Sequence, residues 1–493
     1  MQSKKPYDLA FLVYSLLGMI AMCAIMKVTG GTGFLLIFLA TSVAFGRNRI
    51  EILLYLILMT ATLTVTNAYF APKGMAFSIG ARVLFLLVGS VMMLQLTAQR
   101  SSRMMTPVLT LLVYIGYMAI ISSVGWNPLI SYLKIILFVI IFLAMFSVGN
   151  AAVVSQRIRV ERLRSVFLCM AAFMILGSIL VLPFPGISMM NAADFIGVEG
   201  FHIPDSGLFK GMSIHSQCLG PSIAMLAVVL LADLLFSVRR WDKVYLLLLL
   251  CTPIVVFRTG SRTAMGTLLA GVFFVSFLFV NARGMGARWK TRATSALMIL
   301  GIIGGCLLFI TPQMREKVVS FIYKSGRNTV AEEYQTVENL VSSRQGLMDN
   351  AMANFRESPW IGNGFQVSKE FAYREIVSWK QVLSAPIEKG VWVTAVLEEG
   401  GVFGMTLFAI FLLVAIFGLL ARRAVTGAAA LFVFIIANFG EFTFFSMSYT
   451  GGLMWAMVFT GVALDAQRLK EDRLRRQMAF QGPVTVSAPG YRF

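Results

Sequence analysis

Residues 402–420 read VFGMTLFAIFLLVAIFGLL and contain no charged side chain. A run of about 20 apolar residues is long enough to cross the hydrocarbon core of a bilayer as a helix. The rest of the chain is similar: of 493 residues, 58% are hydrophobic and 13% are charged, and the mean hydropathy is +0.80. Soluble proteins carry roughly 25% charged residues. The composition therefore excludes a soluble globular enzyme and predicts an all-α polytopic integral membrane protein.

Apolar runs of this kind recur along the whole chain. They predict about 14 transmembrane helices, at residues 8–28, 32–46, 51–70, 77–98, 105–124, 131–153, 165–184, 213–236, 243–257, 263–281, 294–312, 393–420, 424–440 and 448–465. We expect the chain to have five parts. Residues 1–184 hold transmembrane helices one to seven, and residues 185–312 hold helices eight to eleven together with a short outer loop at 185–212 and the outer turn between helices nine and ten. A large extracytoplasmic segment follows at 313–392, then the last three helices at 393–465 and a cytoplasmic tail at 466–493.

The charge of the chain follows the predicted topology. The formal net charge is +19, which in a soluble protein would suggest nucleic acid as a partner. With the N-terminus in the cytoplasm, however, every predicted inside segment carries at least two Lys or Arg residues, as the positive-inside rule requires. We therefore expect both termini in the cytoplasm and no nucleic-acid partner.

Motifs for cofactors are missing. All five cysteines lie in apolar runs, without the Cys or His spacing of a metal site. The chain has no P-loop and no strand-linked GxGxxG motif. The first outer loop, KVTGGTG at residues 27–33, lacks the paired carboxylates common in metal-dependent lipid-sugar transferases. We expect no metal, nucleotide or other cofactor, so that energy comes from the substrate or from a gradient.

Two arginines lie in the outer turn RTGSRTA, which runs from Arg258 to Ala264 between two predicted spans. Arginines next to hydrocarbon are costly unless they meet an anion or line a wet cavity. A guanidinium group presents forked donors that suit phosphate and does not deprotonate. Arg258 and Arg262 are therefore candidate phosphate ligands, with snorkelling at a helix end as the alternative.

Three further segments carry polar residues near the outer face. The first contains Lys210, His215 and Gln217 before the eighth span, where a structural histidine is the alternative to a functional one. The second contains Arg344 in an amphipathic segment that leads to a Pro/Gly turn. The third contains Glu388 and, within the twelfth span, Glu398-Glu399-Gly400-Gly401. Carboxylates at a membrane boundary are costly, so function is the first hypothesis for them.

Taken in this order, the four segments resemble the O-antigen ligase and polymerase-like superfamily over about residues 200–465. The resemblance is carried by His215-Ser216-Gln217 with Gly220, by Thr259-Gly260-Ser261-Arg262-Thr263-Ala264, by Arg344 followed by Pro359-Trp360-Ile361-Gly362-Asn363-Gly364-Phe365, and by Glu399 with Gly401 and Gly404. The SRTA element is the most specific of these, and the order of the glycine turns adds to it.

The resemblance implies a bacterial enzyme that moves glycans from undecaprenyl pyrophosphate at the outer face of the inner membrane. It implies that two arginines hold the donor pyrophosphate, and these roles fall on Arg262 and Arg344. Arg258 and Lys210 are further candidates because they lie in the polar segments near the outer face. The resemblance leaves three candidates for the group that orients or deprotonates the acceptor hydroxyl, in the order Glu388, Glu399 and His215. The implied partners are the lipid-linked donor, an acceptor glycan, the bilayer, a flippase and a chain-length regulator.

One departure favours a polymerase. Ligases of this superfamily usually carry a histidine nine residues before the glutamate that corresponds to Glu399, and this chain has Gly390 there. A polymerase that joins lipid-linked repeat units is therefore the first hypothesis, and a ligase acting on lipid A core or protein is the near alternative. A secondary transporter or lipid-glycan flippase is an alternative of another class, although no internal repeat is visible. A membrane scaffold without chemistry would leave the arginine pair unexplained.

Overall fold

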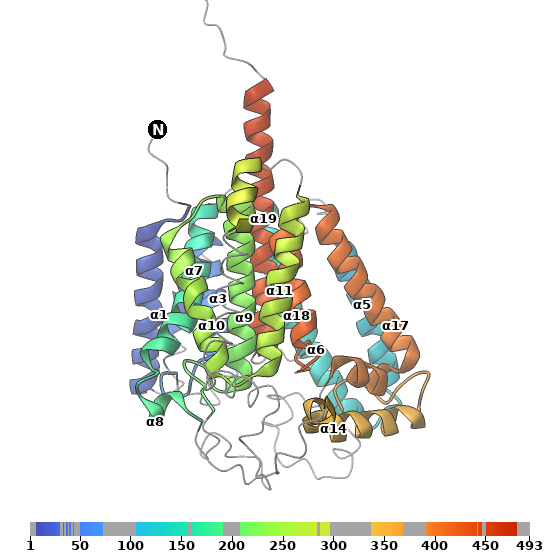
Figure 1. Ribbon diagram of the computed structural model, residues 1–493. Helices are drawn as coiled ribbons and strands as arrows, with labels where there is room; N and C mark the ends of the chain where they lie inside the picture. Colours follow the sequence, from blue (N-terminus) through green and yellow to red (C-terminus); the bar gives the residue numbers. More distant parts are fainter. Residues whose placement is uncertain are drawn as a thin grey trace, which may run out of the picture.

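The computed structural model is an all-helical bundle in the part of the chain that it describes (Figure 1). The described residues are 6–29, 50–71, 105–154, 159–190, 208–282, 286–295, 337–367, 391–440, 442–445 and 450–480, with single residues between 33 and 43. Its helices are α1 (Leu9–Thr29), α3 (Ile50–Val65), α5 (Met105–Ser122), α6 (Pro128–Val154), α7 (Val160–Leu180), α8 (Pro185–Ser188), α9 (Ser216–Asp233) with the π-helical turn η3 (Leu234–Val238), α10 (Lys243–Arg258), α11 (Arg262–Asn281), α14 (Val337–Glu357), α17 (Trp392–Ala421), α18 (Val425–Ala437) and α19 (Thr450–Phe480).

Each predicted span that falls on described residues coincides with a helix. The predicted spans at 77–98, 294–312 and most of 32–46 lie outside the described residues. Five described helices are long and apolar enough to cross a membrane, namely α1, α7, α9 with η3, α11 and α17, and shorter apolar helices accompany them. The total of about 14 spans stays a prediction.

Helix α9 forms the centre of the bundle. All its residues but Gln217 and Cys218 are buried, and it packs against α7, α10, α11, α18 and α19. A helix that is apolar on every side is typical of such a central position. A second core of aromatic rings lies between α5, α6, α17 and α19, where Phe408 contacts Tyr114, Phe444 and Phe445.

The two ends of the bundle differ in their contacts. At one end Arg164 of α7 forms a buried ion pair with Asp233 of α9 (3.0 Å), and the hydroxyl of Tyr245 donates to the same carboxylate at 2.6 Å. The start of α1 lies at this end, because Asp8 accepts a hydrogen bond from Ser165. The charged half of α19 extends from the same end (Figure 1). The start of α1 and the end of α19 therefore lie on one side of the bundle, which we expect to be the cytoplasmic side.

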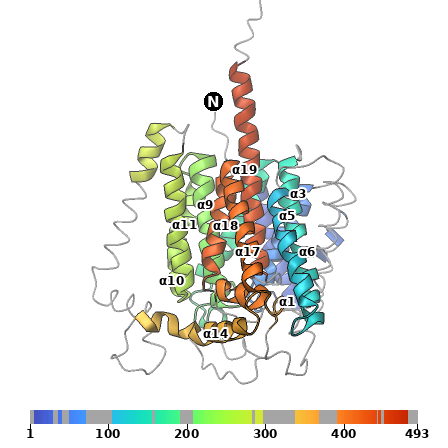
Figure 2. The same cartoon turned by 90° about the vertical axis from the view of Figure 1, so that its right-hand side faces the viewer.

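The opposite end carries the SRTA turn, the Pro359–Phe365 turn and, among the described helices, α14 lying across the bundle. Helix α14 runs roughly perpendicular to the spanning helices below this end (Figure 2). Two isolated β-bridges, Thr66 with Ser213 and Met189 with Phe209, tie the ends of α3 and α8 to the chain before α9. This is the end at which the sequence places its polar motifs.

Two helices carry a feature that the sequence does not predict. The predicted span at 393–420 coincides with α17, and α17 contains a break at Gly401, whose φ of 63° and ψ of −164° are not helical. The predicted last span and the charged helix that follows it are one continuous helix, α19. Its apolar half crosses the bundle, and nothing in its sequence between the two halves stops a helix.

Candidate functional site

The SRTA turn connects α10 to α11 in three residues. Gly260 adopts a φ of 63°, which glycine tolerates without strain. Ser261 then caps α11, because its hydroxyl accepts a hydrogen bond from the Ala264 N–H at 3.2 Å. Serine is among the preferred residues at this position. The turn therefore fixes Arg258 as the last residue of α10 and Arg262 as the first residue of α11.

The two arginines lie at opposite ends of the helix macrodipole, Arg258 at a helix C-terminus and Arg262 at a helix N-terminus. Arg258 is exposed at the C-terminus of α10, where the helix macrodipole favours a cation. Arg262 is half-buried at the N-terminus of α11, where the macrodipole disfavours a cation and favours an anion. A bound phosphate at this position would meet both the guanidinium group and the positive end of α11.

The SRTA turn is packed closely against two glycines. A Cβ atom on Gly220 of α9 would lie 2.7 Å from the Ala264 Cβ and 3.0 Å from the Thr259 hydroxyl. A Cβ atom on Gly440, in the turn after α18, would overlap the Thr263 hydroxyl. The glycine of the His215 motif therefore has a physical role, since it lets the SRTA turn approach α9.

His215 is the N-cap of α9. Its Nδ1 atom accepts a hydrogen bond from the Gln217 N–H at 3.0 Å, and the side chain is half-buried. A neutral imidazole whose Nδ1 accepts carries its proton on Nε2, so that Nε2 is a donor. This geometry suits a hydrogen bond to an anion better than it suits a general base. Lys210 lies five residues earlier and is 4% exposed, and its backbone N–H donates to the Ser188 carbonyl.

Replacing His215 with asparagine distinguishes a role as hydrogen-bond donor to an anion from a role as general base. Asparagine is a good N-cap and keeps a donor, so we expect His215→Asn to retain glycan transfer within about tenfold of the wild type. A general base contributes about 10²–10⁴-fold. A loss of that size in His215→Asn, measured by initial rates at equal protein and donor concentrations, would identify proton transfer by His215 and contradict the expectation.

The turn Pro359–Phe365 interlocks with the break in α17. Ahead of the break, the N–H groups of Asn363 and Gly364 donate to the Glu399 carbonyl at 3.1 and 3.0 Å. Past the break, the Val402 N–H donates to the Pro359 carbonyl at 2.9 Å. The turn thus satisfies backbone groups that the broken helix leaves free, which is required of irregular backbone in a membrane protein.

This interlock depends on glycine at two positions. Gly362 has a φ of 77°, and a Cβ atom there would overlap the Glu399 carbonyl group. Gly401 has a φ of 63°, and a Cβ atom there would overlap the Trp360 carbonyl group. Two motifs that lie about forty residues apart in the sequence (residues 359–365 and 399–404) are therefore one structural unit.

Two asparagines join α14 to this unit, and sequence analysis did not single them out. The Asn354 side chain donates to the Glu398 carboxylate at 2.8 Å. The Asn363 side chain donates to the Asn354 carbonyl at 3.0 Å and to the Glu398 carbonyl at 3.2 Å. Glu398 is 3% exposed, so its hydrogen bonds are shielded from water. Arg344 lies in the first half of the helix that these contacts hold.

Exchanging the amide of Asn354 for a carboxylate should loosen α14. Asn354→Asp places a second acceptor opposite the Glu398 carboxylate, and we expect the loss of this buried hydrogen bond to cost about 1–3 kcal/mol. The measurement is hydrogen exchange of residues 337–357, which should speed up relative to α9. Asn350→Asp, one turn earlier and exposed, is the matched control, and equal exchange in both variants would contradict the expectation.

Helices α5 and α6 hold the other side of the turn. The Tyr117 hydroxyl donates to the Gly400 carbonyl at 2.9 Å, and the Ser122 hydroxyl accepts from the Phe365 N–H at 3.1 Å. Lys134 of α6 is buried and its ammonium group donates to the Gln366 carbonyl at 3.0 Å. No spacing rule in the sequence relates these residues to a turn more than 200 positions away.

The carboxylate candidates have different surroundings. Glu399 is fully buried at the break in α17. Its backbone carbonyl accepts the hydrogen bonds from the Pro359–Phe365 turn. Glu388 lies outside the described residues. Among the described residues, no group of three or more His, Cys, Asp or Glu side chains could hold a metal ion.

The turn after α18 links the two parts of the site. The Asn438 carbonyl accepts from the Trp392 N–H at the start of α17 (3.1 Å). Its side-chain oxygen accepts from the N–H groups of Thr443 and Phe444 at 2.6 and 2.9 Å. Because Gly440 of the same turn contacts Thr263, the SRTA turn and the α17 unit share one end of the bundle.

The fold and this site define a polytopic helical membrane protein with an arginine pair and buried carboxylates at one end. Residues 244–409 match the family model described as O-antigen ligase. The match supports the resemblance to the O-antigen ligase and polymerase-like superfamily over these residues, and this family suggests a glycan-handling membrane enzyme that acts on lipid-linked glycans. It includes the SRTA turn, Arg344 and Glu399, and His215 precedes it. No curated protein matches the chain.

Proposed function

We propose that the protein is a polysaccharide polymerase of the bacterial inner membrane. It transfers a glycan from undecaprenyl pyrophosphate onto a growing lipid-linked glycan at the outer face, without a metal ion. The expected products belong to exopolysaccharide, O-antigen or capsule synthesis. A flippase that delivers the donor and a chain-length regulator are the partners that this function calls for.

The observation that carries the proposal is the shared end of the bundle. The SRTA turn and the unit formed by α14, the Pro359–Phe365 turn and the break in α17 lie at the same end and contact the same turn after α18. Cationic groups for a leaving pyrophosphate and carboxylates for an acceptor hydroxyl thus lie at one end of the bundle. A transporter would need its polar groups near the midplane instead.

The reaction is a substitution at the anomeric carbon of the donor. The acceptor hydroxyl attacks this carbon, the bond to the phosphate oxygen breaks, and undecaprenyl pyrophosphate leaves with the bonding electron pair. Arg262, with Arg344, Arg258 and Lys210, neutralises the charge that develops on the leaving group. Glu388 or Glu399 takes the proton of the acceptor hydroxyl, and the Nε2–H of His215 offers a further donor to the phosphate.

Polymerase is preferred to ligase because of one position. Gly390 stands where ligases of the superfamily usually carry the histidine that is their proposed acceptor base. A carboxylate has to take over its role in this chain. The Glu398-Glu399 pair at the break in α17 is buried and held by backbone contacts on both sides.

The test is a polymerisation assay with the purified full chain in nanodiscs. The donor is an undecaprenyl-pyrophosphate-linked repeat unit, and the buffer contains EDTA and no nucleotide sugar. We expect a ladder of products spaced by one repeat, and no ladder with Arg262→Ala.

Other outcomes would overturn parts of the proposal. Transfer that starts only after lipid A core or a protein acceptor is added would make the protein a ligase. A ladder that requires Mg²⁺ would contradict metal independence. A donor left intact with every acceptor, together with its movement across proteoliposomes, would identify a flippase.

A further inference from the structure

Helix α5 carries two tyrosines, Tyr114 and Tyr117, one turn apart at its contact with α17. The Tyr117 hydroxyl donates to the Gly400 carbonyl at 2.9 Å, directly before the break. The Tyr114 ring packs on Phe408, which follows the break, with ring centroids 5.2 Å apart. Residues three apart on a helix share one face, so both tyrosines belong to the interface between α5 and α17. The proposed reaction uses neither of them.

The Tyr114 hydroxyl is a buried donor without an acceptor. The side chain is fully buried, and its hydroxyl group has no hydrogen-bond partner among the described residues. The ring is held between Phe408 and Phe445, whose centroid lies 5.7 Å away. A buried polar group without a partner is costly and rare in native proteins. The free protein therefore carries a cost at this position that phenylalanine would avoid.

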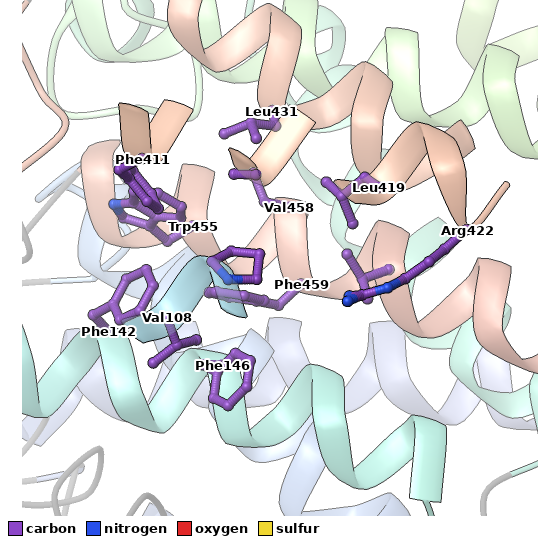
Figure 3. Close-up of a pocket in the computed structure, with 13 residues that line it drawn as sticks. Val108, Phe142, Phe146, Phe411, Leu419, Arg422, Leu431, Trp455, Val458 and Phe459 are labelled. Carbon is purple, nitrogen blue, oxygen red and sulfur yellow. The ribbon is translucent and has the colours of Figure 1, made fainter. Parts of the chain in front are cut away.

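The surroundings of this hydroxyl group are otherwise apolar. Further from the candidate site, the interface of α5, α6, α17 and α19 is lined by aliphatic and aromatic side chains such as Val108 and Phe142, with Arg422 at its edge (Figure 3). Near the break, the Trp392 ring also packs on Phe408 at 5.7 Å, and its indole N–H likewise has no acceptor among the described residues. Two buried donors without acceptors thus contact the same ring, in the half of the interface that is nearest to the candidate site.

An acceptor for the Tyr114 hydroxyl lies at the break itself. The Glu399 carboxylate is fully buried and interacts electrostatically with Tyr114. Glu399 directly precedes Gly400, whose carbonyl Tyr117 holds, so α5 fixes the backbone beside this carboxylate. A carboxylate has two oxygens, and it can accept from a protein donor and from a substrate hydroxyl at the same time. Such a second contact would fix the direction in which the free oxygen points.

We propose that Tyr114 is a positioning residue, whose hydroxyl donates to one oxygen of the Glu399 carboxylate while the acceptor hydroxyl engages the other. The acceptor oxygen then attacks the anomeric carbon, its proton passes to Glu399, and the bond to the pyrophosphate breaks. Tyr114 keeps its own proton throughout. This inference rests on the proposed function, and it assigns the role of acceptor base to Glu399 and not to Glu388.

The test is Tyr114→Phe in the polymerisation assay with the full chain in nanodiscs. Phenylalanine keeps the ring contacts and removes only the hydroxyl group. We expect kcat to fall about 10- to 100-fold, the effect of one hydrogen bond to a charged group. KM for the lipid-linked repeat unit should stay nearly unchanged, because the hydroxyl contacts the carboxylate and not the substrate. In Glu399→Gln, the same substitution should lower the rate no further.

Tyr245→Phe is the matched control for stability. Tyr245 is also fully buried, but its hydroxyl donates to the Asp233 carboxylate at 2.6 Å, at the opposite end of the bundle. Tyr245→Phe removes a hydrogen bond that exists in the free protein, so its melting temperature should fall while kcat stays at the wild-type value. Tyr114→Phe removes a donor without an acceptor, so its melting temperature should stay the same or rise.

A second readout does not require turnover. The infrared carboxyl band of Glu399 is the band that is lost in Glu399→Gln. Adding the undecaprenyl-pyrophosphate-linked repeat unit should shift this band in the wild type and leave it in place in Tyr114→Phe. A wild type that formed no ladder would contradict the proposed function, and the infrared band would then still decide whether Tyr114 engages Glu399.

Three results would overturn the inference. The first is a wild-type kcat in Tyr114→Phe beside an active wild type. The second is a fall in melting temperature as large as that of Tyr245→Phe, which would make the role of Tyr114 structural. The third is a Glu399 band that the repeat unit does not shift in the wild type, or that it shifts equally in Tyr114→Phe.

Discussion

Removing the side chain of Arg262 is expected to lower the rate of glycan transfer by about 10²–10³-fold, the usual effect of losing one preorganised group that stabilises developing charge. The same change should leave the melting temperature unchanged or raise it slightly. A cation at a helix N-terminus is unfavourable by about 0.3–1 kcal/mol, and Arg262 is the first residue of α11. Loss of activity with gain of stability is the signature of a residue placed for a ligand. Initial rates and thermal unfolding in the same detergent measure the two effects.

The controls for this prediction use charge and position. Arg262→Lys keeps the charge but loses the forked donors, so its rate should lie between those of the wild type and Arg262→Ala. Arg288→Ala removes an exposed arginine beyond the opposite end of α11 and should have no effect on transfer. Full activity in Arg262→Ala would rule out a role for this arginine. A large fall in melting temperature would show that its role is structural instead.

The membrane-spanning helices could be predicted because each depends mainly on its own composition. A helix in a bilayer satisfies its backbone groups internally, so an apolar run of sufficient length is a strong signal. Among the described residues, α1, α7, α9 with η3, α11 and α17 follow this rule. A common side for the two chain ends was predicted from Lys and Arg counts; among the described residues, the start of α1 and the end of α19 lie at one end of the bundle (Figure 1), and the side of the membrane stays a prediction.

The break in α17 could not be predicted from its sequence. Gly400-Gly401 lies between Glu398-Glu399 and the apolar run that begins at Val402, and glycine is common in membrane helices. The helix breaks because the Pro359–Phe365 turn supplies backbone partners on both sides of Gly401. The turn lies some forty residues earlier in the chain, whereas hydrophobic periodicity depends only on neighbouring residues.

The candidate site was predicted in its parts but not in its connections. Arginine and carboxylate at a membrane boundary stand out because they are costly there, which is why Arg262 and Glu399 could be singled out. Asn354 and Asn363 carry no such signal, since a neutral amide in a loop or on an amphipathic helix is ordinary. The role of Lys134 could not be predicted either, because a lysine near a helix end is usually a snorkelling residue, whereas Lys134 is buried and donates to the Gln366 carbonyl.

Substituting Gly401 with alanine is expected to abolish glycan transfer by opening the interlock with the Pro359–Phe365 turn. Its φ of 63° and ψ of −164° lie in a region that is essentially restricted to glycine, which costs other residues about 1–3 kcal/mol. The added Cβ would also overlap the Trp360 carbonyl and move the turn away from α17. A displacement of about 1 Å in a catalytic site costs about 10²-fold in rate.

Gly418→Ala is the matched control, because Gly418 is a helical glycine of the same helix whose Cβ would meet only Pro107, at 4.0 Å. It should be neutral or stabilising by up to about 1 kcal/mol, with normal transfer. Gly362→Ala should repeat the effect of Gly401→Ala from the other side, because its Cβ would overlap the Glu399 carbonyl. Since both substitutions open the same contact, their combined loss of unfolding free energy should be smaller than the sum of the two. Additive losses would mean that the turn and the helix break are independent, and the α17 unit would then not be the element that joins Glu399 to α14.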